Sequence, residues 1–260
     1  MQDLRIQILQ FAPAWEDIKA TQQQLAIQFK ELKDVDIVVL PEMFLSGFTM
    51  NPENSAIDQN SEQYKFLIEQ SKVLNCVVCG SVIWKDGDKY YNRFLWIEGG
   101  LEKYHYNKRH LFSLAGEEKV YAKGEKPIII DYRGWRIAPF ICYDIRFPVY
   151  MRRRKDFDYD VLIVVASWPE RRHFAWQQLL AARAIENQAY LIASNRVGID
   201  GKGILHEGGS GMWDYFGKKK AAAQSFKEER VGVLLKKESI EKFRNQFRFL
   251  DDADEFRIEY

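Results

Sequence analysis

Strand-like apolar runs recur along this chain, and stretches with helical character separate the early ones. Strands that alternate with helices are typical of an α/β fold, in which helices cover the faces of a sheet. The later runs are shorter, and glycine-containing turns separate them in a way that suits antiparallel hairpins, so we expect a mixed sheet. The expected strands are Leu4–Phe11, Asp36–Leu40, Cys76–Trp84, Tyr91–Ile97, Lys126–Asp131, Arg136–Cys142, Asp160–Ser167, Ala189–Val197, Gly211–Asp214 and Arg230–Leu235, and the expected helices are Trp15–Leu32, Gln63–Leu74 and Phe174–Gln188.

No linker rich in Ser, Gly or Pro interrupts the chain, so residues 1–260 are predicted to form one domain. The 38 Lys and Arg residues nearly balance the 37 Asp and Glu residues, which offers no general attraction to nucleic acid or to an anionic membrane. The first residues lack the pattern of a signal peptide, and no run is long enough to cross a membrane. Three cysteines are too few for a disulfide framework, so we expect a cytoplasmic protein.

One apolar run ends on a cysteine that is well placed for nucleophilic chemistry. The segment W-R-I-A-P-F-I-C-Y-D-I-R-F-P carries Cys142 at the end of its strand-like part, although Pro139 argues against a central position in a sheet. Open α/β sheets bind ligands at the carboxyl ends of their strands, and a following helix start lowers the pKa of a thiol. Cys142 is therefore a candidate nucleophile. The alternative is a buried thiol that packs as a small apolar side chain, which is how we interpret Cys76 and Cys79.

Two other apolar runs end in the same way. Glu42 follows the run D-I-V-V-L-P, and Trp168 follows the run D-V-L-I-V-V-A-S. If these strands are parallel neighbours of the strand that carries Cys142, the three side chains meet at one rim of the sheet. Burial at a strand end makes a carboxylate a better proton acceptor, so Glu42 is a candidate general base. An exposed glutamate in a loop is the alternative.

Lys108 lies in the basic and aromatic stretch Y-H-Y-N-K-R-H-L-F. A lysine near a thiol stabilises both a thiolate and the oxyanion that forms during acyl transfer, whereas a solvated surface position is the alternative. The charged run is too short for a nucleic-acid site in a neutral chain. Four histidines leave a Cys–His arrangement open as a competitor of a Cys–Glu–Lys arrangement. No group of His and Cys has the spacing of a zinc site.

Three motifs together resemble the signatures of the nitrilase (carbon–nitrogen hydrolase) superfamily. They are V-V-L-P-E-M-F around Glu42, Y-N-K-R-H-L-F around Lys108 and I-C-Y-D-I-R-F-P around Cys142, in the family's order. The resemblance continues through A-A-R-A-I-E-N-Q and S-N-R-V-G and covers nearly the whole chain. L-P-E-M-F-L-S-G-F and A-S-W-P-E-R-R are most similar to the ω-amidase branch, which hydrolyses the terminal amide of 2-oxo dicarboxylate monoamides such as 2-oxoglutaramate or 2-oxosuccinamate.

The resemblance implies a four-layer αββα sandwich with two mixed β-sheets, assembled as a homodimer or larger homo-oligomer. It also implies a mechanism that uses no metal and no cofactor, with a small-molecule amide as the substrate. On this basis Glu42 accepts the thiol proton, Cys142 attacks the amide carbon, and Lys108 and the backbone N–H of Tyr143 bind the oxyanion. Ammonia then leaves, and water hydrolyses the thioester.

Two further assignments depend on the same resemblance. Members of the superfamily commonly have a second glutamate after the lysine motif, for which we prefer Glu117 to its neighbour Glu118. A 2-oxo acid also needs a cation for its carboxylate, for which we prefer Arg172 to Arg171. Both arginines follow Trp168, which we expect to line the substrate site, and a surface ion pair is the alternative reading of each arginine.

The sequence leaves three functions open. The preferred one is a thiol amidohydrolase of the ω-amidase type. The second is a hydrolase of another C–N bond, such as that of an N-carbamoyl amine or a peptide-like amide. The third is a non-catalytic interaction protein that keeps the fold, and the joint presence of Glu42, Lys108 and Cys142 argues against it.

Overall fold

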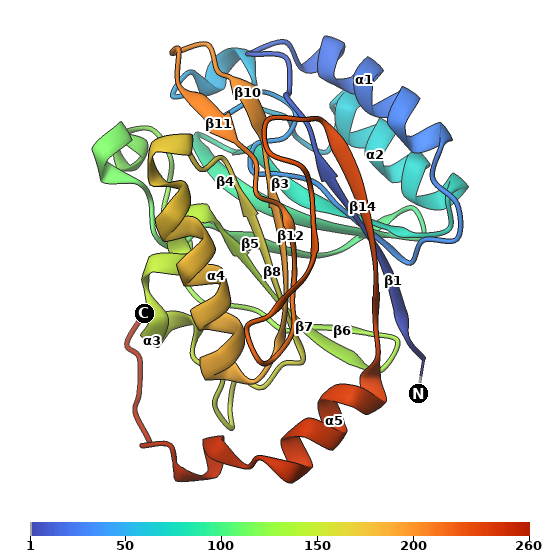
Figure 1. Ribbon diagram of the computed structural model, residues 1–260. Helices are drawn as coiled ribbons and strands as arrows, with labels where there is room; N and C mark the ends of the chain where they lie inside the picture. The colour runs from blue at the N-terminus through green and yellow to red at the C-terminus, as the bar shows by residue number, and fades with distance from the viewer. Residues whose placement is uncertain (1) are drawn as a thin grey trace.

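The computed structural model describes residues 2–260 and contains two six-stranded sheets that pack face to face (Figure 1). A large apolar core fills the space between them, with side chains from both sheets. A separate two-stranded hairpin lies outside the sheets. The strands are β1 (Leu4–Gln10), β2 (Ile37–Val39), β3 (Val77–Asp86), β4 (Lys89–Glu98), β5 (Leu101–Asn107), β6 (Ile130–Tyr132), β7 (Trp135–Ile141), β8 (Val161–Ala166), β9 (Tyr190–Asn195), β10 (Val197–Ile199), β11 (Leu205–Glu207), β12 (Gly211–Trp213), β13 (Lys219–Ala222) and β14 (Glu229–Leu235).

Both sheets are mixed, as the sequence predicts. The first has the order β14-β1-β2-β3-β4-β5, and its parallel pairs are β1–β2 and β2–β3. The second has the order β13-β12-β9-β8-β7-β6, and its parallel pairs are β7–β8 and β8–β9. The V-L-I-V-V-A sequence of β8 is buried along its whole length, because this strand lies in the middle of a covered sheet.

Helices cover the outer faces of both sheets and complete the four-layer αββα sandwich, which confirms the predicted fold class (Figure 1). The helices α1 (Ile18–Lys30) and α2 (Glu62–Val73) pack on the first sheet, and α3 (Pro148–Met151) and α4 (His173–Asn187) lie on the side of the second. In α4 the side chains of Trp176, Leu180 and Ala184 recur every four residues and form its buried face. The last helix, α5 (Lys237–Gln246), follows β14.

Glu42, Cys142 and Trp168 line one cavity, but only two of the three strands that precede them are the parallel neighbours that the sequence analysis considered. The strand before Glu42 is β2, which belongs to the first sheet, whereas β7 and β8 belong to the second. The carboxyl ends of β2 and β8 come together across the two packed sheets at this point, where the Glu42 N–H donates to the Ala166 carbonyl at 3.3 Å. Pro139 is tolerated inside β7 because β6 pairs with β7 only as far as Ile137.

The structure adds elements that the apolar pattern did not predict. They are β5, β10, β11, β13, α3 and α5, whose sequences are mostly polar or very short. The run predicted at Lys126–Asp131 forms a strand only from Ile130, and the run predicted at Ala189–Val197 is divided between β9 and β10. None of the helices within residues 2–260 has the length and apolar character needed to span a membrane.

Candidate active site

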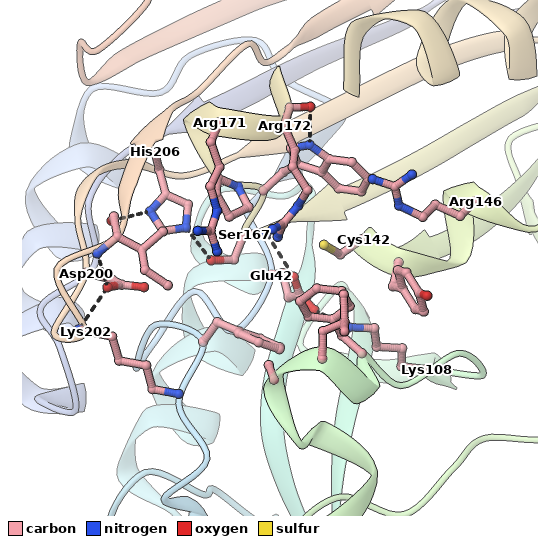
Figure 2. Close-up of a pocket in the computed structure, with 18 residues that line it drawn as sticks. Glu42, Lys108, Cys142, Arg146, Ser167, Arg171, Arg172, Asp200, Lys202 and His206 are labelled. Atoms are coloured by element: carbon pink, nitrogen blue, oxygen red, sulfur yellow. Dashed lines mark hydrogen bonds and ion pairs between the residues drawn. The ribbon is translucent and has the colours of Figure 1, made fainter. Parts of the chain in front are cut away.

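Cys142 stands where β7 gives way to the short 3₁₀ helix η4 (Cys142–Arg146), as the sequence predicts. Its backbone φ of +44° lies in the left-handed region, which residues with side chains rarely adopt. The cysteine lines a cavity of about 310 Å³ beside the carboxyl ends of β7 and β8 (Figure 2). A strained residue of this kind persists only where its surroundings hold it in place.

Contacts on both sides of the cysteine provide that support. The buried carboxylate of Asp144 accepts hydrogen bonds from the N–H of Ile141 and the N–H of His110, both at 3.0 Å. On the other side, the guanidinium of Arg183 in α4 donates to the Ile145 carbonyl at 2.7 and 3.0 Å. These contacts fix the turn that carries the thiol to two separate elements.

A buried cluster of four polar side chains lies behind the thiol. We call Glu42, Asn92, Lys108 and Glu117 the buried cluster, and none of them is more than 1% exposed. Lys108 Nζ lies 2.7 Å from Glu42 Oε1 and 2.9 Å from Glu117 Oε2. The Asn92 amide donates to the same two carboxylates, at 2.8 and 3.0 Å. The Ser167 N–H donates to Glu42 Oε2 at 2.9 Å, so each oxygen of Glu42 accepts at least one hydrogen bond and Oε2 can accept another.

The cluster contains one cation for two carboxylates, and this ratio determines its electrostatics. Burial alone would lower the pKa of Lys108, but the carboxylates of Glu117 and Glu42 outweigh burial and raise that pKa above its ordinary value. Burial raises the pKa of Glu117, and the positive charge of Lys108 opposes this rise. Lys108 is therefore a permanent ammonium ion held between two acids.

The thiol itself is neutral in the resting site, which corrects the expectation of a lowered pKa. Burial raises the pKa of Cys142, the Glu42 carboxylate raises it further, and Lys108 lowers it. The start of a helix therefore does not suffice to ionise this thiol, because burial and the neighbouring Glu42 carboxylate both oppose ionisation. A neutral thiol is a weak nucleophile, and a neighbouring base that accepts its proton would activate it.

The two adjacent glutamates, Glu117 and Glu118, lie in different environments. Glu117 is fully buried, and its Oε2 atom also accepts the N–H of Phe112 at 2.6 Å. Glu118 is exposed and lies outside the buried cluster. The backbone next to Lys108 packs closely against Gly124. A Cβ atom at Gly124 would lie 1.9 Å from the Asn107 carbonyl oxygen, so only glycine fits at this position.

Tyr143 and Trp168 line the same cavity as the thiol, at different depths. The backbone N–H of Tyr143 lies in the first turn of η4, where N–H groups have no acceptor within the helix. Trp168 is buried, and its indole N–H donates to the Arg172 carbonyl at 2.8 Å. The indole ring therefore forms a fixed wall of the cavity.

Three arginines line one side of the cavity, and we call Arg146, Arg171 and Arg172 the arginine rim (Figure 2). The Arg146 guanidinium lies over the Trp168 ring at 4.7 Å, and that of Arg172 lies over the Phe112 ring at 5.2 Å. Within residues 2–260 no Asp or Glu forms an ion pair with any of the three, so the surface ion pair considered from the sequence is not found. Arg171 is exposed, whereas Arg172 is half-buried.

The geometry also separates the competing readings of the cysteines and histidines. Cys76 and Cys79 are buried in the core, as predicted. His206 lines the cavity, but its ring contacts the Ser167 hydroxyl and the Ile204 carbonyl, and across residues 2–260 no histidine forms a hydrogen bond with Cys142. The same part of the chain has no group of three or more His, Cys, Asp or Glu side chains that could hold a metal ion.

Sequence reasoning missed several residues of this site. Arg146 lies in the same motif, I-C-Y-D-I-R-F-P, as Cys142. Its closeness to the cysteine in the sequence is the signal that could have identified it. Asn92 lies beside Tyr91 and Arg93 in the mostly polar first half of β4, and only its burial reveals a role. Ser167 and His206 come from separate elements, and no local pattern connects them.

Comparisons with known proteins agree with this geometry. The sequence profile of the family described as carbon-nitrogen hydrolase matches residues 5–245. The omega-amidase YafV of Escherichia coli K12 is 39% identical over 258 residues, which cover 99% of this chain and 100% of that protein. A 2-oxoglutaramate amidase of Bacillus subtilis is 33% identical over 172 residues, which cover 65% of this chain and 66% of that protein.

A comparison with solved structures also finds a member of this superfamily with the same fold. XC1258 from Xanthomonas campestris, described as a CN-hydrolase superfamily protein with an arsenic adduct in its active site, superposes with a TM-score of 0.96. It is 34% identical, and the match covers 100% of both chains. These matches confirm the resemblance that the three motifs carry, and the chain belongs to the carbon–nitrogen hydrolase (nitrilase) superfamily.

Proposed function

We propose that this protein is a thiol amidohydrolase of the ω-amidase type, which cleaves the terminal amide of a small 2-oxo dicarboxylate monoamide such as 2-oxoglutaramate or 2-oxosuccinamate. The observation that carries the proposal is the arginine rim, whose guanidinium groups border the cavity of Cys142 and form no ion pair with an Asp or Glu of residues 2–260. Guanidinium groups bind carboxylates in a bidentate manner, so such a cavity suits an amide that also carries a carboxylate. The names of the relatives in Escherichia coli and Bacillus subtilis support the same substrate class.

In the proposed acylation, Glu42 accepts the proton of the Cys142 thiol, and the sulfur attacks the amide carbon. The C=O electrons move onto the oxygen, where Lys108 Nζ and the Tyr143 N–H bind the developing charge. The tetrahedral adduct then collapses, the C–N bond breaks, and the proton held by Glu42 passes to the leaving nitrogen. Ammonia and a thioester result.

In the proposed deacylation, water replaces ammonia beside the thioester. Glu42 accepts a proton from this water, the resulting hydroxide attacks the thioester carbon, and the C–S bond breaks. The proton on Glu42 returns to the sulfur, which restores the resting thiol. Glu117 takes the role of holding Lys108, since its two oxygens lie 3.1 and 2.9 Å from Lys108 Nζ.

The substrate carboxylate is proposed to bind Arg172, against the wall that Trp168 forms. Arg172 is favoured over Arg171 because it is half-buried and stacked on Phe112, which reduces the freedom that binding must remove. Arg146, on the Trp168 ring, is available to the 2-oxo group or to the same carboxylate.

The test is ammonia release from 2-oxoglutaramate by the purified protein. We expect turnover that falls by at least about 10³-fold in Cys142→Ala and in Glu42→Gln, because each removes a group that acts in the bond-breaking steps. Cys76→Ala is the matched control, since it deletes a buried thiol that lies outside the cavity, and it should retain turnover.

A panel of related compounds decides between this function and its alternatives. Hydrolysis of an N-carbamoyl amine or a peptide-like amide in place of 2-oxoglutaramate would move the assignment to another C–N bond. An absence of turnover on the whole panel by a folded protein would favour a non-catalytic interaction protein instead.

Two further parts of the proposal concern the assembly and the compartment. We propose a homodimer or larger homo-oligomer that works in the cytoplasm. Val149 on α3 and Phe174 and Ile185 on α4 expose more than half of their surface, which supports an association through these helices. Light scattering coupled to size-exclusion chromatography measures the assembly, and a monomeric mass would contradict it.

A further inference from the structure

Ser167 lies at the inner end of the cavity, between His206 on one side and Glu42 and Cys142 on the other (Figure 2). It follows β8 directly and is 7% exposed. Its backbone N–H donates to Glu42 Oε2 at 2.9 Å, and the same N–H lowers the pKa of the Cys142 thiol. The backbone of Ser167 thus contacts both reacting groups, while its hydroxyl has no part in the chemistry described above.

The orientation of this hydroxyl follows from the hydrogen bonds of His206. His206 Nδ1 lies 3.0 Å from the Ile204 carbonyl oxygen, which can only accept, so Nδ1 carries a proton. A neutral imidazole has a single N–H, which leaves Nε2 as an acceptor. Nε2 lies 3.3 Å from Ser167 Oγ, and therefore the hydroxyl donates its proton to the histidine.

The surroundings of His206 keep the ring neutral. It is 2% exposed, and burial and the nearby Arg196 lower the pKa of His206 to about 4, against a smaller opposite effect of Asp200. At neutral pH the ring therefore holds one proton, and that proton is committed to Ile204. The lone pairs of Ser167 Oγ remain free to face the cavity.

We propose that Ser167 Oγ accepts an N–H of the scissile carboxamide, and that His206 is the positioning residue that keeps the serine in this acceptor state. This proposal rests on the proposed amidase function and deepens it, because it identifies what distinguishes an amide from an ester at this site. Ser167 touches the substrate in this scheme, whereas His206 acts only through Ser167.

The chemistry of a primary amide explains why such an acceptor is needed. When the carbonyl oxygen lies against Lys108 and the Tyr143 N–H, the NH₂ group points toward Glu42 and Ser167. This group has two N–H donors, and a donor without an acceptor is costly in a buried cavity. Glu42 can accept one of them, and the Ser167 hydroxyl accepts the second. A serine that pointed its own proton into the cavity would repel that N–H.

The experiment compares acylation of the enzyme by two substrates with the same acyl group, 2-oxoglutaramate and the 5-methyl ester of 2-oxoglutarate. Release of ammonia or of methanol is measured in a single turnover with enzyme in excess, so that the later hydrolysis of the thioester does not contribute. The ester has an oxygen in place of the NH₂ group and offers no N–H. We expect Ser167→Ala to slow acylation by the amide about 10- to 100-fold and acylation by the ester less than about 3-fold.

A double-mutant cycle separates positioning by His206 from a merely structural effect. His206→Phe should slow amide acylation as Ser167→Ala does, but should have no further effect when Ser167 is already alanine. His206→Gln should restore part of the rate, because its carbonyl oxygen can accept the serine proton. Thermal melting curves verify that each variant is folded, and His206→Gln provides the measurement if His206→Phe is not.

Two results would overturn the proposal. One is an equal loss of amide and ester acylation in Ser167→Ala, and the other is a cost of His206→Phe that is as large in the Ser167→Ala background as in the wild type. Both differ from a failure of the proposed function, in which the wild-type enzyme itself releases no ammonia from any amide.

Discussion

The buried cluster and the arginine rim belong to the same cavity, but they differ in whether their charged groups have partners within the protein. In the buried cluster every carboxylate oxygen accepts at least one hydrogen bond from a protein donor, and Lys108 lies between both acids. At the arginine rim the three guanidinium groups stack on aromatic rings or reach solvent, and none forms an ion pair with Asp or Glu within residues 2–260.

This difference separates two tasks of one site. A cluster whose partners are all internal is organised before any substrate arrives, which is what a group that must stabilise a transition state requires. A rim that lacks an internal anion is complete only when a ligand supplies one. Substitutions in the cluster should therefore affect folding and every substrate, whereas substitutions at the rim should affect only substrates that carry a carboxylate.

The largest effect is expected from Lys108→Met, which leaves two buried carboxylates without their cation. Removal of one partner of a buried ion pair costs about 3–5 kcal/mol of folding stability, because the remaining charge is uncompensated. The loss should become smaller as the pH falls, since loss of the lysine raises the pKa of Glu117 further and protonation removes the charge. Urea denaturation at neutral and acidic pH measures both effects.

Lys103→Met is the matched control, because Lys103 lies on β5, the strand that Lys108 directly follows, but is exposed. It should change stability by less than about 0.5 kcal/mol. If Lys108→Met were as stable as this control, the buried cluster would not depend on its cation, and the comparison with the rim would lose its physical basis.

The parts of the site that the sequence predicts are those where one residue follows an apolar strand. Cys142 follows β7, and Glu42 lies just beyond β2, so strand composition alone indicates that they stand at strand ends. Their partnership with Lys108 depended on the family resemblance, because the three positions come from distant parts of the chain. The prediction of one domain for residues 1–260 stays a prediction.

The parts that the sequence could not predict depend on contacts between elements. Strand composition does not reveal which sheet a strand joins, so the sequence could not show that β2 and β7 lie in different sheets although Glu42 and Cys142 line one cavity. Asn92 lies 50 residues from Glu42 along the chain, and the Ser167–His206 contact spans 39 residues. A lowered thiol pKa was expected from local helix geometry, but burial of the thiol and the carboxylate of Glu42, which follows a strand of the other sheet, raise the pKa instead.

An intermediate effect is expected for the pH dependence of folding stability, to which His206 contributes. The ring of this histidine is hydrogen-bonded and neutral in the folded protein. Its pKa in the folded protein is about 4, against 6.5 for an ordinary histidine. Below pH 6.5 the unfolded chain binds a proton that the folded protein does not, so this residue makes stability fall as the pH decreases from about 6.5 to about 4. Between pH 7 and pH 5 the contribution is about 2 kcal/mol.

The measurement compares the wild type with His206→Gln in urea at pH 7 and pH 5. Other groups titrate in both proteins, so only the difference between their two pH dependences belongs to His206. The variant should lose about 2 kcal/mol less than the wild type over this interval. Parallel losses would mean that the histidine is protonated in the folded protein, and a charged ring would remove the acceptor that Ser167 requires.

The smallest effect is expected at the rim, and it should depend on the substrate. Arg172→Ala removes a guanidinium that we propose to bind the substrate carboxylate, and it should lower kcat/KM for 2-oxoglutaramate about 10- to 30-fold, mainly through KM. Butyramide has no carboxylate, so its slower hydrolysis should change less than about 2-fold. Arg171→Ala is the matched control, since Arg171 is the exposed neighbour, and it should cost less than about 3-fold on either substrate.

The decisive quantity is the ratio of kcat/KM for 2-oxoglutaramate to kcat/KM for butyramide, because this ratio does not depend on how much of each variant is folded. A variant that merely disturbs the cavity would lower both rates together, as a substitution in the buried cluster should. If Arg172→Ala did so, the rim would be part of the fixed machinery and the carboxylate would have to bind elsewhere. If Arg171→Ala instead gave the selective loss, the exposed arginine would be the anchor, and stacking on Phe112 would not be what prepares a guanidinium for the substrate.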